Sequence, residues 1–287
     1  MINDIELRLE KCEFIYLMDK YPDIAFNFKD WNGNARKGKK HLYATEGYIT
    51  SPYNYDPKNI EQFATFLCSN SKFKRIYPYY DIRLTNGPLN SDNYYNLTDF
   101  VDYENKMKCI CSLCKIYKPV TSEGSILHLR EIIANDLGSQ KKIPLHTYGP
   151  VPWGLDYKGF PIYDPNKYMP NHFTNLKLIN KYMFCLALEP MYHELWSWDW
   201  ITERLFNCFK SKTIAIYYGC YNIEDIIPLN LFIDYRKFYF DNNKLVEYLL
   251  SITKDQYMEI TENAYNWYRD KCKIGDVEVL ENIFSSL

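Results

Sequence analysis

Polar side chains that could bind a ligand gather in residues 182–238, at the ends of expected strands and helices. Glu189 directly follows a short apolar run, which is typical of a strand buried on both faces. Thr202 precedes a helical pattern and is a good N-cap residue. Gly219 ends a second apolar run as a turn residue that needs permissive backbone angles. Ligands of α/β proteins bind beyond the carboxyl ends of strands, next to helix N-termini, so one ligand site is predicted here. Its expected members are Glu189, Thr202, Glu203, Arg204 and Gly219.

Alternating strand and helix patterns position this site in the second half of the chain. Strands are expected at residues 108–113, 143–149, 183–188 and 213–218, and helices at 125–137, 175–182, from 202 onward, 244–252, 254–270 and 277–284. This alternation predicts an α/β fold. A loop rich in aromatic residues, 191–200, separates the strand that precedes Glu189 from the helix that begins at Thr202.

The helix expected at residues 125–137 has one apolar face. Its apolar positions are Ile126, Leu129, Ile132, Ile133 and Leu137. Arg130 and Glu131 are expected to lie off that face, and Gly138 is expected to be the C-cap.

The first half of the chain has shorter apolar runs, which indicate a second and less regular α/β unit. Strands are expected at residues 14–18, 24–28 and 41–45, a helix at 59–67 and a long surface loop at 85–102. Two domains are therefore expected, residues 1–105 and residues 106–287.

Composition narrows the classes of function. Of the 287 residues, 47% are hydrophobic and 24% are charged, which is ordinary for a globular protein. The formal net charge of −2 gives no reason to expect nucleic acid or an anionic membrane as a partner. There is no apolar run near the ~20 residues that span a bilayer and no signal-peptide pattern, so a soluble, cytoplasmic protein is expected. The 28 tyrosines are explained first by an AT-rich genome, and they also suit sugar binding, because their rings stack on apolar sugar faces.

The nine cysteines are expected to be reduced thiols, because the chain shows no export signal. Cys109, Cys111 and Cys114 form a C-x-C-x-x-C cluster that has two interpretations. One is a metal site. The other is a set of small buried strand residues, favoured because the alternation fits a strand and no second Cys/His pair lies at zinc spacing.

The ordered motifs of residues 182–238 resemble the signature of the alpha-1,3-fucosyltransferase family. In that family a strand ending in Phe-Glu-Asn leads to Tyr-Val-Thr-Glu-Lys, a helix and Val-Pro-Val-Tyr-Tyr-Gly. The matching segments here are Leu188-Glu189-Pro190, Trp200-Ile201-Thr202-Glu203-Arg204 and Ala215-Ile216-Tyr217-Tyr218-Gly219. Residues 40–47 and 75–81 are similar to two further segments of bacterial members. Animal and plant members carry a membrane anchor, and since no such segment is found here, the resemblance implies a bacterial or viral enzyme, or a shortened form of a longer protein.

The resemblance implies a fold and a reaction. The expected fold is α/β, with two Rossmann-like lobes of the GT-B type, a cleft between them and a shortened N-terminal lobe. The implied reaction is an inverting transfer of fucose from GDP-fucose to a glycan hydroxyl by single displacement. The expected partners are thus a nucleotide-sugar donor and a glycan acceptor.

The resemblance also implies roles for individual residues in donor binding. Arg130 and Arg204 are expected on the donor diphosphate, where a planar, permanently charged guanidinium fits well. Glu203 is expected on the ribose hydroxyls and Glu189 on the donor sugar. Thr202, Tyr218 and Gly219 are expected to complete the donor site.

For the general base, Glu46 is the candidate by position, while His41 and His193 are alternatives on chemistry alone. The sequence lacks an Asp-x-Asp motif and offers cationic side chains, so no cofactor and no required metal are expected. Two other functions stay open. One is the same fold using another nucleotide sugar, motivated by Pro190 and the shortened N-terminal lobe; the other is a sugar- or nucleotide-binding protein without catalysis.

Overall fold

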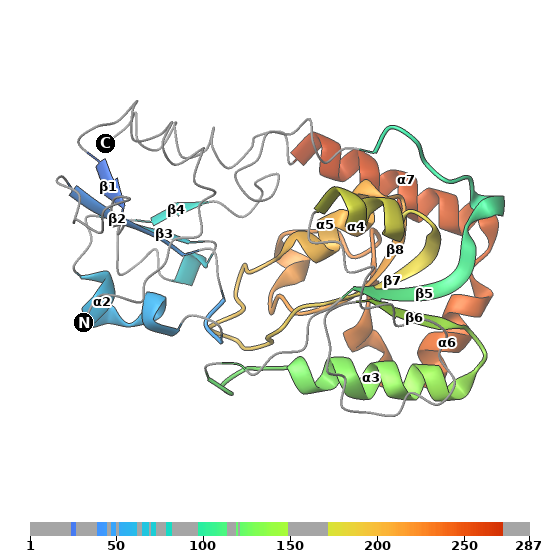
Figure 1. Ribbon diagram of the computed structural model, residues 1–287, viewed down its shortest axis with the longest axis horizontal. Coiled ribbons are helices and arrows are strands. Elements are labelled where there is room, and N and C mark those ends of the chain that lie inside the picture. The colour runs from blue at the N-terminus through green and yellow to red at the C-terminus, as the bar shows by residue number, and fades with distance from the viewer. Residues whose placement is uncertain are drawn as a thin grey trace.

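The computed structural model of the chain describes residues 24–26, 39–44, 47–49, 52–61, 65–68, 70–72, 79–81, 97–113, 119, 121–148 and 172–271. These residues form two separate parallel sheets, with strand orders β1-β2-β3-β4 and β6-β5-β7-β8-β9 (Figure 1). The expected domain boundary at residues 105/106 falls between the last strand of the first sheet and the first strand of the second.

The first sheet contains β1 (Ile24–Phe26), β2 (Lys39–Ala44), β3 (Thr65–Cys68) and β4 (Tyr79–Asp81). The strands expected at 24–28 and 41–45 are confirmed as β1 and β2. The strand expected at 14–18 and most of the loop expected at 85–102 lie outside the described residues.

The helix expected at residues 59–67 is wrong from Thr65 onward, and residues 62–64 lie outside the described residues. Helix α2 spans Pro57–Ile60, after the 3-10 turn η1 (Pro52–Tyr55), and the chain enters β3 at Thr65. Parallel pairing with β2, from His41↔Thr65 to Ala44↔Cys68, together with pairing to β4 on the other side, makes this segment a strand. Tertiary pairing therefore overrides the helical spacing of its apolar residues.

The second sheet contains β5 (Met107–Leu113), β6 (Leu145–Tyr148), β7 (Tyr182–Leu188), β8 (Ile214–Tyr218) and β9 (Ile233–Asp234). All four strands expected in this half are confirmed, with small shifts of their bounds. Every residue of β7 and β8 is buried, as in a parallel sheet covered on both faces. Because the strand order reverses between β5 and β7, the carboxyl ends of these two strands flank the place where such sheets bind ligands.

Helices cover both faces of the second sheet (Figure 1). Helices α3 (Leu127–Gln140) and α6 (Asn242–Ser251) lie on one face, and α4 (His172–Ile179), α5 (Glu203–Lys210) and α7 (Lys254–Lys271) lie on the other. Short 3-10 turns connect them: η4 (Tyr103–Asn105), η6 (Ile223–Asp225) and η7 (Tyr235–Phe238). The helix expected at 277–284 lies outside the described residues.

Helix α3 corrects three details of the prediction. It continues past Gly138 to Gln140, and Lys141 ends it in the left-handed conformation at φ 57°. Ile132 is 56% exposed, although it was assigned to the apolar face. Arg130 is only 2% exposed, because its side chain turns inward to a carbonyl at the end of β7.

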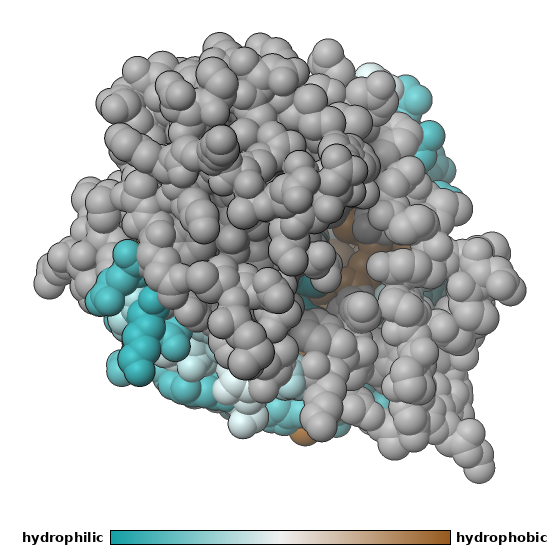
Figure 2. Space-filling model, turned by 60° about the vertical axis from the view of Figure 1, so that its left-hand side comes forward, coloured by the Kyte–Doolittle hydropathy of each residue, from teal (hydrophilic) through white to brown (hydrophobic). Residues whose placement is uncertain are grey.

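The apolar core lies in two layers, one between the sheet and α3 and α6, the other between the sheet and α4, α5 and α7. On the face shown in Figure 2, the described residues at the outer edge are mostly hydrophilic, and a hydrophobic area is visible further in. Cys111 is a fully buried residue of β5 and Cys109 a partly buried one, as the strand interpretation predicted, whereas Cys114 lies outside the described residues. Within the described ranges, no helix combines the length and the apolar character needed to cross a bilayer.

Candidate functional site

A buried carboxylate ties the end of β7 to the start of α5. Glu189 directly follows β7, and its residue is 0% exposed. Its Oε1 accepts a hydrogen bond from the Thr202 backbone N–H at 2.8 Å, and its Oε2 accepts one from the Thr202 hydroxyl at 2.7 Å. The Arg204 Nη1 lies 3.4 Å from the same Oε2. We call Glu189, Thr202 and Arg204 the Glu189 clamp, because together they hold a strand end against a helix N-terminus.

The electrostatics of the clamp are those of a buried ion with specific partners. Burial raises the pKa of the Glu189 carboxyl, and the neighbouring Arg204 guanidinium and the two hydrogen bonds from Thr202 act in the opposite direction. A buried carboxylate is stable only when such partners surround it. Glu189 is thus placed to orient Thr202 and Arg204, and its expected contact with the donor sugar stays a prediction.

Gly219 makes room for this carboxylate. A Cβ atom at Gly219 would lie 2.2 Å from both the Cβ and the Cγ of Glu189. Among the described glycines, the positive φ belongs to Gly124, at 71°. The turn at Gly219 was predicted from backbone freedom, but the structure requires glycine there because the Glu189 side chain occupies the space.

The N-terminus of α5 presents charged side chains at the surface. The N-cap predicted at Thr202 is confirmed, since its hydroxyl accepts from the Arg204 N–H at 3.4 Å. The side chain of Glu203 is 35% exposed and that of Arg204 is 23% exposed, with 3.8 Å between Oε1 and Nη1. The N-terminus of α5, the Arg204 guanidinium and the Glu203 carboxylate therefore share one surface. The first two can bind an anion, and the carboxylate can accept hydrogen bonds from hydroxyl groups.

Arg130 reaches the same strand end from the opposite face of the sheet. Its Nε and Nη2 donate to the Leu188 carbonyl oxygen at 3.1 and 2.6 Å. The structure thus brings Arg130 next to Glu189, but with its guanidinium buried. Contact with a diphosphate stays a prediction for this residue, while its hold on the end of β7 is observed.

Tyr218, the last residue of β8, belongs to a group of rings at the carboxyl edge of the sheet. Its ring stacks on Tyr192 at 4.6 Å between centroids, and Phe240 meets it edge-on at 5.2 Å. Burial raises the pKa of the Tyr218 hydroxyl, so this group is neutral at physiological pH. Tyr218 therefore offers a hydrogen bond and a ring, but no charge.

The general base is the least defined part of the site. Glu46 lies outside the described residues, so its assignment stays a prediction, and His41 is placed only as a residue of β2. His193 is described: its Nδ1 accepts from the Leu195 N–H at 3.1 Å, and its Nε2 lies 3.7 Å from Glu123. These contacts give His193 a role in shaping a turn.

Residues 191–200 connect the two sheets, and we call them the bridging loop. The Asn70 side-chain amide donates to the Leu195 carbonyl at 2.6 Å, and the Ser71 N–H donates to Asp199 at 3.0 Å. The Lys72 ammonium donates to the Glu194 carbonyl at 2.5 Å. The sequence showed that this loop is aromatic, but not that it binds the segment after β3.

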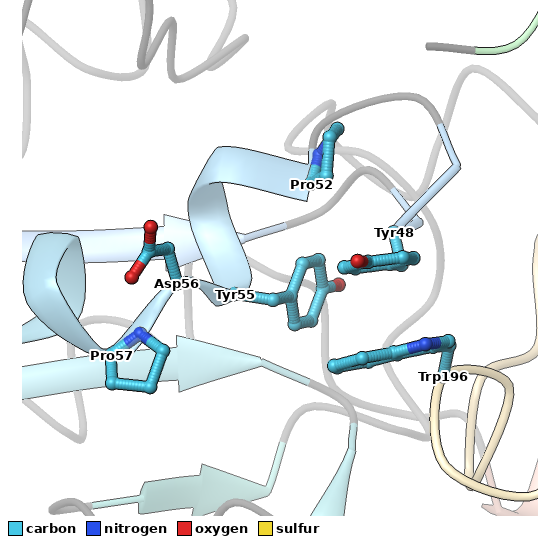
Figure 3. Close-up of a pocket in the computed structure, with 6 residues that line it drawn as sticks. All are labelled: Tyr48, Pro52, Tyr55, Asp56, Pro57 and Trp196. Carbon is cyan, nitrogen blue, oxygen red and sulfur yellow. The ribbon is translucent and has the colours of Figure 1, made fainter. Parts of the chain in front are cut away.

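Sequence reasoning missed a pocket between the bridging loop and the residues that follow β2. Tyr48, Pro52, Tyr55, Asp56, Pro57 and Trp196 line it (Figure 3), and we call it the aromatic pocket. The one available signal was the number of aromatic residues in the loop, because nothing local indicates that residues 48 and 196 meet. In the described part of the chain, no group of three or more His, Cys, Asp or Glu side chains is arranged to hold a metal.

Comparison with solved structures defines the class of the fold. A trehalose-6-phosphate synthase matches 87% of this chain and 66% of its own chain at a TM-score of 0.51 and 9% identity. An alpha1,3-fucosyltransferase solved with GDP matches 83% of this chain and 68% of its own at a TM-score of 0.50 and 15% identity. The fold is therefore that of the GT-B glycosyltransferases.

Sequence comparison identifies the family within that class. Residues 115–285, more than half of the chain, match the sequence model of the C-terminal part of glycosyltransferase family 10 (fucosyltransferase). The chain belongs to glycosyltransferase family 10. It is similar to 4-galactosyl-N-acetylglucosaminide 3-alpha-L-fucosyltransferase 9 of Bos taurus, 27% identical over 168 residues, and of Mus musculus, 26% identical over 167 residues. These alignments cover 58% of this chain and 38% of each relative.

Proposed function

We propose that this protein is an inverting, metal-independent glycosyltransferase that transfers fucose from GDP-fucose to a glycan hydroxyl by single displacement. The observation that carries the proposal is the Glu189 clamp, which sets a half-buried arginine and a helix N-terminus at the carboxyl end of β7. Membership of a fucosyltransferase family and a GT-B neighbour solved with GDP support this donor. The similar 3-alpha-L-fucosyltransferases act on a 4-galactosyl-N-acetylglucosaminide, which motivates this acceptor in the proposal.

In this proposal the positive charge needed by the leaving group comes from the protein. Departure of GDP leaves negative charge on the diphosphate, and Arg204 with the N–H groups of α5 would stabilise it. Glu203, on the adjacent surface, would accept hydrogen bonds from the ribose hydroxyls. Arg130 and Glu189 would hold the strand end and the helix start at a fixed separation, and Glu46 would remove the acceptor proton.

A second candidate is the same chemistry with another nucleotide sugar. It is motivated by Pro190, which follows Glu189 and has no N–H to offer a ligand, while its carbonyl accepts from the Ile126 N–H at 2.9 Å. Different contacts to the donor sugar would follow from a proline at this position.

The test is a donor panel assayed in the presence of a chelator. GDP-fucose, GDP-mannose and UDP-galactose are each incubated with 4-galactosyl-N-acetylglucosamine, and nucleotide release and transfer product are measured. We expect release and transfer with GDP-fucose, and at least a tenfold loss in Glu203→Gln. Turnover of a different nucleotide sugar would select the second candidate, and nucleotide binding with no turnover of any donor would select the binding protein.

A further inference from the structure

The aromatic pocket, of about 330 Å³, lies at the junction of two parts of the chain that are distant in sequence (Figure 3). Five of its six residues follow β2, and Trp196 comes from the bridging loop. The same loop joins Glu189 to Thr202, so the pocket is linked by the chain to the proposed donor site. Tyr48 follows the proposed base, Glu46, by two positions in the sequence.

The rings of the pocket form a fixed corner. Tyr48 and Trp196 stack with centroids 3.9 Å apart and planes 4° apart. Tyr55 stands across both rings, at 70° to Tyr48 and 66° to Trp196, with centroids 6.0 and 6.1 Å away. Figure 3 shows the two stacked rings with the Tyr55 ring directed at their edges. Because Tyr55 is only 4% exposed, this corner is anchored in the protein.

One carboxylate fixes the polar ends of both stacked rings. Glu123 accepts from the Trp196 Nε1–H at 2.9 Å through Oε1, and from the Tyr48 hydroxyl at 3.5 Å through Oε2. The rings therefore lose little further freedom when a ligand binds, which favours affinity.

The charge near the pocket indicates the kind of ligand. Asp56 lies at the side opposite Trp196; its Oδ1 accepts from the Lys58 N–H at 3.0 Å, and the residue is exposed. With Glu123 on the other side, two carboxylates flank the rings and disfavour a phosphate or another anion. A neutral pyranose fits these features, because its C–H face packs on rings while its hydroxyls donate to a carboxylate.

We propose that the aromatic pocket binds a neutral pyranose of the acceptor glycan. This inference rests on the proposed function, since it assigns the acceptor of the same enzyme. The bridging loop then serves both substrates: its ends carry the Glu189 clamp, and Trp196 at its middle contributes to the acceptor pocket.

Saturation-transfer NMR with 4-galactosyl-N-acetylglucosamine and with methyl glycosides of galactose, glucose and N-acetylglucosamine tests the proposal. The wild type is compared with Trp196→Ala and with two conservative variants, Trp196→Phe and Asp56→Asn. The control is Tyr239→Ala, which removes an 85% exposed ring that does not line the pocket. GDP binding is measured calorimetrically on the same samples. We expect Trp196→Ala and Asp56→Asn to raise the dissociation constant of at least one sugar about tenfold, with a smaller change in Trp196→Phe and none in Tyr239→Ala. GDP affinity should stay unchanged.

The two proposals fail in different ways in this experiment. If the wild type binds none of the sugars, or binds them equally well in Trp196→Ala and Asp56→Asn while GDP still binds, the pocket proposal is overturned and the donor proposal stands. If sugars bind in a Trp196-dependent manner but GDP does not bind, the pocket stands as a sugar site and the proposed transferase activity fails. If Trp196→Ala does not fold, Trp196→Phe and Asp56→Asn decide the question.

Discussion

The Glu189 clamp and the aromatic pocket are joined by the bridging loop, and each is held together by different forces. The clamp is polar and buried: its carboxylate is 0% exposed and has partners at 2.7, 2.8 and 3.4 Å. The pocket is made of stacked rings and is pinned by Glu123, whose side chain is 51% exposed. Loss of one partner of a buried ion costs much free energy, whereas stacked rings tolerate small shifts in position. We infer that substitutions in the clamp, at the proposed donor site, disturb the structure more than substitutions in the pocket, although both are fixed in the native state.

Gly219→Ala should have the largest effect on the clamp. A methyl group would lie 2.2 Å from two carbons of Glu189, so the carboxylate has to leave its partners. We expect a loss of about 3 kcal/mol in unfolding free energy. Urea unfolding measures this value, and Gly138→Ala in helix α3 is the control, expected to be neutral or stabilising by up to about 1 kcal/mol. A Gly219→Ala protein as stable as the wild type would show that Glu189 is not confined as described.

Arg130→Lys tests the two hydrogen bonds by which Arg130 holds the end of β7 next to the clamp. The variant keeps the charge but replaces two donors to the Leu188 carbonyl by one. We expect a loss of about 2 kcal/mol in unfolding free energy, with GDP affinity changed less than threefold because the guanidinium is buried. A tenfold loss of GDP affinity in a variant that is folded and stable would instead support direct contact with the diphosphate.

Glu189→Gln should make stability respond differently to pH. Burial raises the pKa of Glu189 in the folded state, so above its ordinary pKa the folded protein binds more protons than the unfolded chain. The stability that this group contributes is then fully present below its unfolded pKa and is lost as pH rises through the folded pKa. The unfolding free energy of the wild type, relative to the variant, should therefore fall from pH 4.5 towards neutral pH. A difference that stays constant or rises across urea titrations in this range would contradict the burial argument.

Glu123→Ala should have the smallest effect on stability and a selective effect on the pocket. The side chain is half exposed, so unfolding free energy should change by less than about 0.5 kcal/mol. Release of the Trp196 and Tyr48 rings should weaken sugar binding about threefold, and Glu123→Gln should restore part of it through the remaining acceptor. Glu247→Ala, an exposed carboxylate of α6, is the control. Equal sugar binding in Glu123→Ala, Glu123→Gln and Glu247→Ala would show that binding does not depend on the hydrogen bonds from the two rings to Glu123.

The proximity of the clamp residues could be predicted from sequence, because they lie at the ends of strongly patterned elements, whereas their contacts with one another could not. The apolar runs before Glu189 and Gly219 and the cap at Thr202 are local signals, and parallel strands bring their ends together. Contacts between distant residues were not predictable in this way. Arg130 donates to the Leu188 carbonyl, 58 positions further along the chain. Its burial could therefore not be predicted from the helix pattern, which places it off the apolar face. Pairing with β2 turned an apparent helix into β3, and the stacking of Tyr48 on Trp196 has no local signature.

Calorimetric binding of GDP, in the presence of a chelator, to the wild type and to Arg204→Ala tests the central claim most directly. Lys237→Ala, an exposed cation of η7, is the matched control. If the clamp aims Arg204 at the donor diphosphate, GDP binds the wild type and Lys237→Ala equally, and binding to Arg204→Ala is at least tenfold weaker. Absence of GDP binding to the wild type, or equal affinity in Arg204→Ala, would contradict the donor site proposed for this protein.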